Sequence, residues 1–265
     1  MMINTMLSDV EFTRYSRQLM VADIAETGQQ QLKNAQVLII GAGGLGSAVG
    51  LYLAAAGVGK IVIADNDELE ASNLQRQVLY RNPDLGCNKA QAACAQMAAL
   101  NSLNRYRAVT SRLTGIQLAL EVEQADIVVD CSDNFSTRYA VNHACFEAKK
   151  RLVSGAAIGW QGQLIAFDFG VGVGPCYQCL LPEVAQPHTD IQNCRSGGIV
   201  GPVVGVIGTM QALAVIKAIV NAGKIGFKQF SQFDGLQGQW QQLEINADEN
   251  CTVCGAHKLV NGDAV

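Results

Sequence analysis

The sequence has little charge and few histidines. Only 16% of its 265 residues are charged, 49% are hydrophobic, and the net charge is −4. This balance excludes an intrinsically disordered chain and argues against nucleic acid as the main ligand, although local basic pockets remain compatible with it. The histidines, His143, His188 and His257, do not have the spacing of a metal-ligand set.

A targeting segment is also missing from the first 20 residues. Four charged residues between Asp9 and Arg17 occupy the region where a signal peptide would have its apolar core. The one apolar run of membrane-spanning length, residues 199–220, is interrupted by Gln211 and Lys217. We expect this run to be a buried helix packed on a sheet, and the protein to be cytoplasmic, with no membrane partner.

The hydrophobic pattern predicts an α/β fold. Ser8-Asp-Val-Glu11 forms a capping box, so a helix should begin there, and a second short helix should end before Asn34. Apolar runs then alternate with helical patterns, which favours a Rossmann-like, mainly parallel sheet flanked by helices. The expected strands are 36–40, 60–64, 105–112, 125–130 and 151–154, and the expected helices are 45–56, 88–100, 116–123 and 134–149.

The pattern changes after Ala157. Residues 161–169 and 230–245 have the composition of antiparallel strands around the helix expected at 199–220. We therefore divide one compact unit into an N-terminal helical segment (1–34), a Rossmann-like nucleotide-binding part (35–157) and an antiparallel part (158–265). A polar stretch with two prolines, 182–197, is expected to be a mobile loop.

A glycine-rich turn joins the first predicted strand to its helix. Gly41, Gly43 and Gly46 have the GxGxxG spacing, which lets backbone amides approach a phosphate at the helix N-terminus. Asp65 ends the next strand, where a carboxylate can accept hydrogen bonds from ribose hydroxyls. The turn alone cannot choose between NAD, FAD and ATP.

Three further residues favour nucleotidyl transfer. Arg76, in the polar stretch Ser72-Asn-Leu-Gln-Arg-Gln77, and Lys89 are cations beyond the second strand, and Asp133 follows a buried strand. The cations can neutralise a pyrophosphate leaving group, and the carboxylate can hold Mg²⁺. An NAD-dependent oxidoreductase, the alternative, would have no use for these residues.

Two pairs of cysteines have metal-ligand spacing. Cys176-Tyr-Gln-Cys179 and Cys251-Thr-Val-Cys254 supply four thiolates, enough for a closed, structural zinc site. A thioredoxin-like redox pair is the alternative, but neither pair follows the first strand. Buried, small side chains are expected at four other positions: Cys87, Cys94, Cys131 and Cys145.

The ninth cysteine stands apart. Cys194 precedes Arg195 in the polar loop, where a cation and a following helix N-terminus would lower its thiol pKa. The sequence leaves open whether Cys194 is a nucleophile or an inert loop residue.

Several of these motifs, in this order, resemble the ubiquitin-activating-enzyme-like superfamily, and within it the bacterial ThiF and MoeB adenylyltransferases. The resemblance extends from about Asp9 to Gly255. It is carried by the glycine-rich turn, Asp65, Lys89 and three short stretches: Arg14-Tyr-Ser-Arg-Gln18, Ser72–Gln77 and Asp130-Cys-Ser-Asp-Asn134.

The resemblance implies adenylylation of the C-terminal Gly-Gly carboxylate of a ubiquitin-like sulfur carrier by MgATP. Gly44, Asn73, Arg76 and Lys89 would contact phosphates, Asp65 the ribose, and Asp133 the Mg²⁺. Arg17 would reach the ATP of the other subunit of a homodimer, and the four paired cysteines would hold zinc. The expected nucleotide-binding residues are Gly41, Gly43, Gly44, Gly46, Asp65, Ser72, Asn73, Leu74, Gln75, Arg76, Lys89, Asp133 and Asn134.

Two loops favour the thiamine branch of this family. Residues 193–205 and 233–240 resemble the ThiF form more than the MoeB form. The same chemistry on a MoaD-type carrier in molybdopterin synthesis remains the alternative, and a non-catalytic scaffold would be expected to lose the ATP contacts. No rhodanese domain follows the second cysteine pair, so we expect a separate persulfide donor. Cys194 would capture the activated carrier as a thioester or acyl disulfide.

Overall fold

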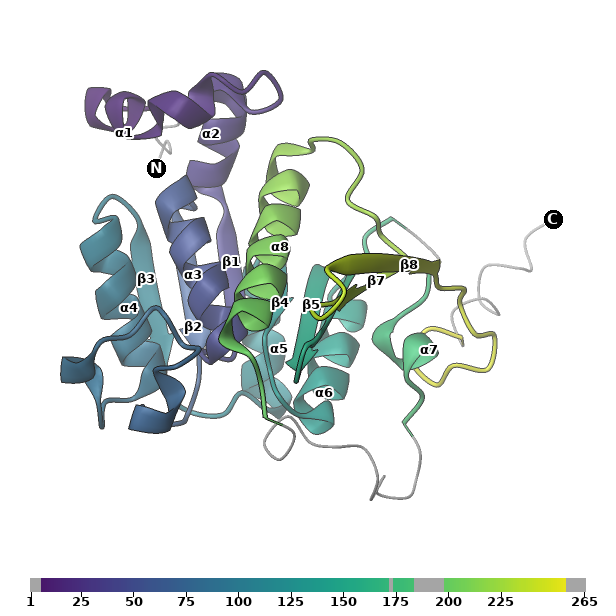
Figure 1. Ribbon diagram of the computed structural model, residues 1–265. Helices are drawn as coiled ribbons and strands as arrows, with labels where there is room; N and C mark the ends of the chain where they lie inside the picture. The colour runs from purple at the N-terminus through teal and green to yellow at the C-terminus, as the bar shows by residue number, and fades with distance from the viewer. Residues whose placement is uncertain (1–5, 172–173, 184–197, 256–265) are drawn as a thin grey trace.

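The computed structural model describes residues 6–171, 174–183 and 198–255. Within them, eight strands form one sheet in the order β3-β2-β1-β4-β5-β6-β7-β8 (Figure 1). The first five strands along the chain are parallel and the last three are antiparallel, as the sequence predicts. The strands are β1 (Gln36–Ile40), β2 (Lys60–Ala64), β3 (Arg105–Val109), β4 (Ile127–Asp130), β5 (Arg151–Ile158), β6 (Gln161–Asp168), β7 (Gln229–Asp234) and β8 (Gln239–Glu244).

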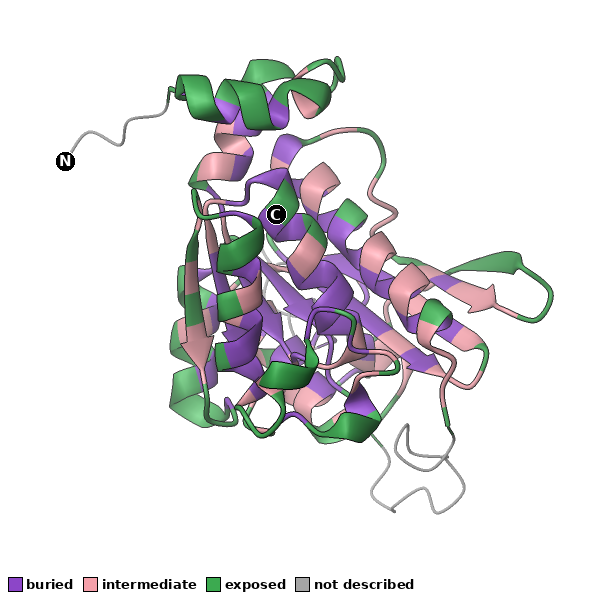
Figure 2. Ribbon diagram, turned by 60° about the vertical axis from the view of Figure 1, so that its left-hand side comes forward, coloured by how far each residue is buried: buried purple, intermediate pink, exposed green. Residues whose placement is uncertain are grey.

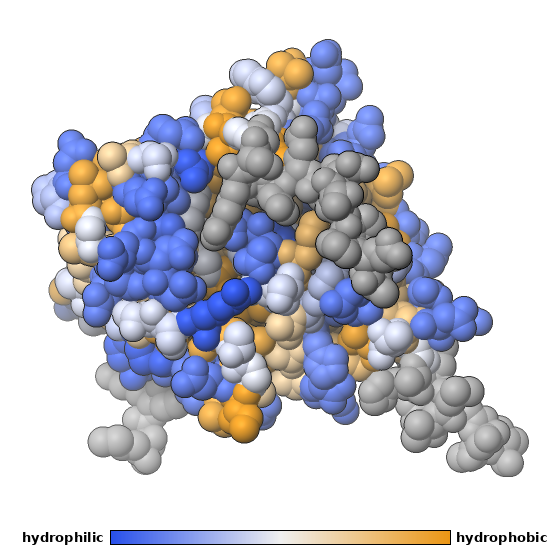
Figure 3. Space-filling view, turned by 90° about the horizontal axis from the view of Figure 1, so that it is seen from below, coloured by the Kyte–Doolittle hydropathy of each residue, from blue (hydrophilic) through white to orange (hydrophobic). Residues whose placement is uncertain are grey.

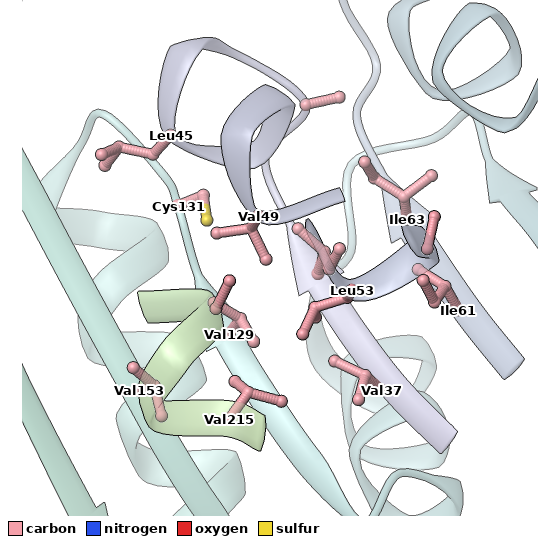
Figure 4. Close-up of a cluster of buried hydrophobic side chains, with 14 of the residues drawn as sticks. Val37, Leu45, Val49, Leu53, Ile61, Ile63, Val129, Cys131, Val153 and Val215 are labelled. Carbon is pink, nitrogen blue, oxygen red and sulfur yellow. The ribbon is translucent and has the colours of Figure 1, made fainter. Parts of the chain in front are cut away.

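Helices cover both faces of the parallel part of the sheet. Successive strand side chains point to opposite faces, so Val37 and Ile39 of β1 enter one apolar cluster and Leu38 and Ile40 enter another. The first cluster is covered by α3 (Gly44–Ala56), α4 (Lys89–Leu100) and α8 (Gly201–Val220), and the second by α5 (Gly115–Gln124) and α6 (Phe135–Glu147). Figure 4 shows the first cluster, in which Val49 and Leu53 of α3 and Val215 of α8 pack over the strands. Burial on both faces explains why β1, β2 and β4 are nearly all apolar.

The long apolar run is a core helix. In the described part of the chain, α8 is the one helix long and apolar enough to cross a membrane. Its inner side chains, such as Ile207 and Val215, are fully buried beside α3 and β5. Figure 2 shows that buried residues are concentrated in the central strands and in the faces of the helices that pack on them. Gln211, which interrupts the run, is also fully buried, and its Nε2 donates to the carbonyl oxygen of Asp130 at 2.9 Å. The polar interruption is therefore a contact with the sheet.

The first two helices, α1 (Asp9–Leu19) and α2 (Ala25–Asn34), lie beyond the amino ends of the parallel strands (Figure 1). The predicted capping box is confirmed: Ser8 Oγ accepts from the Glu11 amide and Glu11 accepts from the Ser8 amide. The hydroxyl oxygen of buried Tyr15 accepts a 2.9 Å hydrogen bond from Nδ2 of Asn101, which ties α1 to the end of α4. Arg17 is exposed on this helix.

Three expectations were wrong in detail. The strand expected at 105–112 ends at Val109, since its carbonyl makes the last bond to the Asp65 amide before the chain turns. The strand expected at 151–154 continues to Ile158, because β6 pairs with it along its whole length. Cys131 and Cys145 are buried as expected and Cys94 is half-buried, but Cys87 is exposed, because it lies in the turn before α4.

Candidate active site

A cavity of about 920 Å³ opens at the carboxyl edge of the sheet, where β1, β2 and β4 end. Ligands of open α/β sheets bind at this edge, where the strand order reverses between β1 and β4. Seen from below, this face of the molecule is mostly hydrophilic around its centre (Figure 3). The cavity wall includes eleven of the thirteen expected nucleotide-binding residues: Gly41, Gly43, Gly44, Asp65, Ser72, Asn73, Gln75, Arg76, Lys89, Asp133 and Asn134.

Two glycines of the glycine-rich turn, Gly41 and Gly44, leave no room for a side chain. Gly41 has a φ of +96°, and a Cβ on it would lie 2.7 Å from the carbonyl oxygen of Cys131. A Cβ on Gly44 would lie 2.5 Å from Cγ1 of Val204. No side chain caps α3, whose N-cap is Gly43, so its first amides are available to an anion in the cavity.

Asp65 joins the end of β2 to this turn. One carboxylate oxygen accepts from the Ala42 amide at 2.7 Å and the other from the Asp67 amide at 2.9 Å. Burial raises the pKa of the Asp65 carboxyl, and the two amide hydrogen bonds partly offset that rise. The carboxylate has further lone pairs that a ribose hydroxyl could use.

Two cations line the cavity on the side of the Ser72–Gln77 stretch. The buried Lys89 extends its ammonium to Asp67 at 3.1 Å, and Arg76 donates to the carbonyl oxygen of Ser72 at 3.1 Å. Asn73, also buried, accepts from the Glu70 amide at 3.1 Å, which holds the short helix η1 (Ala71–Asn73). The arrangement places two positive charges near a helix N-terminus that already favours anions.

The opposite wall holds Asp133 and Asn134, and it includes a cation that sequence analysis missed. Asn134 caps α6 by accepting from the Thr137 amide at 2.9 Å, and Asp133 is exposed just before it. Arg112 lines the cavity with its guanidinium 3.2 Å from Thr137 Oγ1. The sequence places Arg112 inside the strand expected at 105–112 and gives no signal that it lines the cavity; β3 ends at Val109, which frees Arg112 for this position.

A buried ion pair, also missed, lies behind Asp133. Arg138 donates to the Asp130 carboxylate at 3.3 Å, and their side chains are 6% and 2% exposed. The same guanidinium contacts Ser154 Oγ at 3.0 Å and the carbonyl oxygens of Ser132 and Gly155. Arg138 also lines the cavity. Its hydrogen bond to the carbonyl oxygen of Ser132 connects the ion pair to the turn that carries Asp133.

The paired cysteines form one cluster, as predicted. The Sγ atoms of Cys176, Cys179, Cys251 and Cys254 all lie within 4.8 Å of one another, with separations of 3.6 Å and 3.2 Å across the two pairs. Tetrahedral zinc with Zn–S bonds of about 2.3 Å would place its sulfurs about 3.8 Å apart. The donor set and its spacing therefore fit zinc.

The surroundings of this cluster favour a cation. Burial raises the pKa of the Cys176 thiol to about 11, so a thiolate at this position needs a positive charge beside it. The Asp248 amide lies 3.4 Å from Cys179 Sγ and can donate to a thiolate there. Cys179 lies in the short helix α7 (Tyr177–Leu180), Cys176 is the N-cap of that helix, and residues after β8 carry the second pair.

Comparison with known proteins gives the family. The model of the ThiF family matches residues 15–253. The chain belongs to the ThiF family. This membership agrees with the resemblance carried by the motifs and with the architecture of the sheet.

Two curated relatives and one solved structure are similar over most of the chain. The Escherichia coli sulfur carrier protein ThiS adenylyltransferase is 43% identical over 249 residues, which cover 94% of this chain and 97% of that protein. The Drosophila persimilis adenylyltransferase and sulfurtransferase MOCS3 is 41% identical over 97% of this chain, but the chain spans only 56% of that protein's length. The crystal structure of E. coli MccB with ATP has 27% identity and a TM-score of 0.79, covering 91% of this chain and 74% of MccB.

Four expected site residues lie away from the cavity or outside the described residues. Gly46 and Leu74 are not on the cavity wall; Gly46 is a packing glycine, since a Cβ there would lie 2.0 Å from the carbonyl oxygen of Gly41. Arg17 of this ThiF-family chain lies on α1, at the opposite end of the parallel strands. Cys194 lies outside the residues that the structure describes, as does most of the loop expected at 182–197.

Proposed function

We propose that this protein adenylylates the C-terminal Gly-Gly carboxylate of a ubiquitin-like, ThiS-type sulfur carrier with ATP, for thiazole formation in thiamine synthesis. The carrying observation is that one cavity joins a glycine-rich turn and a ribose-type carboxylate to the cations Arg76 and Lys89. The similarity of this chain to the E. coli ThiS adenylyltransferase, over nearly the full length of both proteins, supports the same conclusion.

The reaction needs charge neutralisation more than acid–base catalysis. A carboxylate oxygen of the carrier attacks the α-phosphorus, and the bond from that phosphorus to the β-phosphate oxygen breaks, which gives an acyl-adenylate and pyrophosphate. The carboxylate is already ionised, so no proton has to be removed. We assign ribose binding to Asp65, and stabilisation of the phosphates to the α3 amides, Asn73, Arg76 and Lys89.

Asp133 is the proposed Mg²⁺ ligand. Its carboxylate lies on the cavity wall across from the two cations, and hard oxygen ligands suit Mg²⁺. Magnesium bound there would supply positive charge to the leaving pyrophosphate.

We propose a homodimer in which Arg17 serves the partner's nucleotide. Within its own chain Arg17 is exposed on α1, beyond the end of the strands opposite to the cavity. An arginine held there is available to a second subunit, and Tyr15 and Gln18 anchor the helix that carries it.

We further propose a structural zinc on Cys176, Cys179, Cys251 and Cys254, and a cytoplasmic location. Sulfur would come from a separate persulfide protein. Cys194 would capture the activated carrier after adenylylation, so it should be dispensable for the first half-reaction.

The alternative is the same chemistry on a MoaD-type carrier. The relatives named adenylyltransferase and sulfurtransferase, 41–42% identical to this chain, keep that alternative open. Both alternatives share the nucleotide site and differ only in the carrier.

Carrier-dependent exchange of labelled pyrophosphate into ATP tests the proposal. The protein is mixed with MgATP and either a ThiS-type or a MoaD-type carrier, with carriers lacking the terminal glycine as controls. We expect exchange with the ThiS-type carrier and none with the truncated forms. Exchange only with the MoaD-type carrier would move the protein to the other branch, and binding of NAD in place of ATP would overturn the assignment.

A further inference from the structure

The side chain of Arg138 holds the turn between β4 and α6 through buried hydrogen bonds. This turn, residues 131–134, places Asp133 on the cavity wall. The side chain of Arg138 is only 6% exposed, so its guanidinium bonds to protein groups more than to water. One guanidinium nitrogen of Arg138 donates to the carbonyl oxygen of Ser132, next to Asp133. The same nitrogen donates to the carbonyl oxygen of Gly155 in β5 at 2.8 Å.

The Asp130 carboxylate completes this arrangement. One oxygen accepts from the Ser132 amide at 3.0 Å and from Ser132 Oγ at 2.6 Å, and the other accepts from Ser154 Oγ at 2.7 Å and from Arg138 at 3.3 Å. Four donors around one buried carboxylate define its geometry closely, since each bond is made away from water. Asp130 and Arg138 therefore tie the turn to both β5 and α6.

The same turn supports the phosphate-binding glycines. A Cβ on Gly41 would lie 2.7 Å from the carbonyl oxygen of Cys131 and 3.2 Å from the Ser132 amide nitrogen, so the two loops are in direct contact. A shift of this turn would therefore displace both Asp133 and the backbone of Gly41, which is in contact with it. Displacements of about 1 Å at such a site can cost a hundredfold in rate.

We propose that Arg138 is a positioning residue for the adenylylation proposed above, on which this inference rests. Arg138 holds the turn of residues 131–134 so that Asp133 and Gly41 keep their positions on either side of the nucleotide phosphates. Lysine could not replace it, because an ammonium is a point donor, whereas the planar guanidinium spans the carboxylate and two carbonyl oxygens at once.

The chain offers a matched control. Arg151, at the start of β5, also pairs with a carboxylate, Asp168 at 2.8 Å, and also donates to a backbone carbonyl oxygen, that of Ala218 at 2.7 Å. Each arginine lies over an aromatic ring, Arg138 over Tyr177 and Arg151 over Phe227. Arg151 is not on the cavity wall, and its side chain is 32% exposed, so Arg151→Lys reports the loss of an arginine–carboxylate pair away from the cavity.

The experiment compares Arg138→Lys, Ser154→Ala and Arg151→Lys with the wild-type protein. Thermal unfolding gives stability, calorimetry gives ATP affinity with and without Mg²⁺, and pyrophosphate exchange is measured across a Mg²⁺ titration. For Arg138→Lys we expect exchange to fall at least about tenfold and the half-saturating Mg²⁺ concentration to rise several-fold. Ser154→Ala should change both in the same direction by less, and Arg151→Lys should change neither.

Unchanged Mg²⁺ dependence in a folded Arg138→Lys protein would overturn the proposal, as would an equal loss in Arg151→Lys. If Arg138→Lys does not fold, Ser154→Ala decides the matter by the same criteria. Absence of exchange in the wild-type protein would instead refute the adenylylation. The Mg²⁺-dependent gain in ATP affinity would then still show whether Arg138 positions Asp133.

Discussion

The ammonium of Lys89 lies 3.1 Å from Oδ2 of Asp67, and their side chains are 9% and 46% exposed. A buried cation thus points to a carboxylate at the edge of the cavity. The ion pair keeps the Lys89 side chain extended toward the place where a nucleotide phosphate would lie. The Asp67 carboxylate then competes with the phosphate for the Lys89 ammonium.

Replacing Lys89 should therefore slow the reaction strongly. We expect Lys89→Met to lower pyrophosphate exchange by about a hundredfold or more, because one charge-stabilising donor is worth about that in a site closed to water. Asp67→Asn should instead tighten ATP binding, since it removes the competing carboxylate. Calorimetry and exchange assays check both, and weaker ATP binding in Asp67→Asn would contradict the competition.

Arg76 should be as important, for the same electrostatic reason. We expect Arg76→Ala to lose exchange by about a hundredfold or more while its melting temperature stays close to that of the wild-type protein. The matched control is Arg81→Ala, because Arg81 is exposed and contacts only the backbone oxygens of its own turn among the partners that the structure describes. Loss of exchange in both variants would point to misfolding of this segment.

The raised pKa of Asp65 predicts a pH dependence of ATP binding. Because burial raises this pKa, Asp65 takes up a proton at a higher pH than an ordinary aspartate. A protonated Asp65 accepts fewer hydrogen bonds, so ATP affinity should fall as the pH is lowered through the raised pKa. Stability should change the opposite way: the contribution of Asp65 to the free energy of unfolding declines as the pH rises from the unfolded pKa to the folded one.

Calorimetric titrations at decreasing pH check this prediction against Asp65→Asn. The variant should bind ATP more weakly near neutral pH and show a flatter profile below it. Equal slopes for the two proteins would assign the pH dependence to another group.

The contact between Gly44 and Val204 predicts a rescue. Gly44→Ala should weaken ATP binding, because the new Cβ would meet Val204 Cγ1 at 2.5 Å and force α3 and α8 apart. The double variant Gly44→Ala/Val204→Ala should recover much of the affinity, as expected for residues in contact. Gly205→Ala is the control, since nothing lies within 4 Å of a Cβ at that position. No recovery in the double variant would locate the damage in the turn itself.

The cysteine cluster predicts about one zinc per chain, bound by four thiolates. Metal analysis measures the content, and the charge-transfer absorption of a cobalt-substituted protein reports thiolate ligation. Cys254→Ser should lose metal and stability, whereas Cys87→Ser should lose neither, because Cys87 is exposed and is not one of the four clustered cysteines. A metal-free protein with full stability would refute the site.

Much of this architecture follows from local sequence patterns. Buried parallel strands are continuous apolar runs, the Ser8 capping box starts α1, and Gly57, with a φ of +87°, ends α3. The expected residues of the cavity also come together, because the carboxyl ends of parallel strands share one edge.

What could not be predicted depends on contacts between distant segments. No local pattern singles out Arg138, since only the fold brings Asp130, Ser154 and Gly155 around it. Arg112 was assigned to a strand because nothing local shows where β3 leaves the sheet. Gln211 looked like a polar interruption, since its partner, the carbonyl oxygen of Asp130, lies 81 residues away in sequence.

The position of α8 has a consequence for synthesis of the chain. The strands that it contacts, β4, β5 and β6, all leave the ribosome before residue 201 does. At a translation rate of about 5–20 residues per second, the apolar face that these strands present to α8 stays exposed for several seconds before α8 is synthesised. We expect the nascent chain to depend on chaperones during this interval, and ribosome-bound fragments that end before α8 to be captured by them.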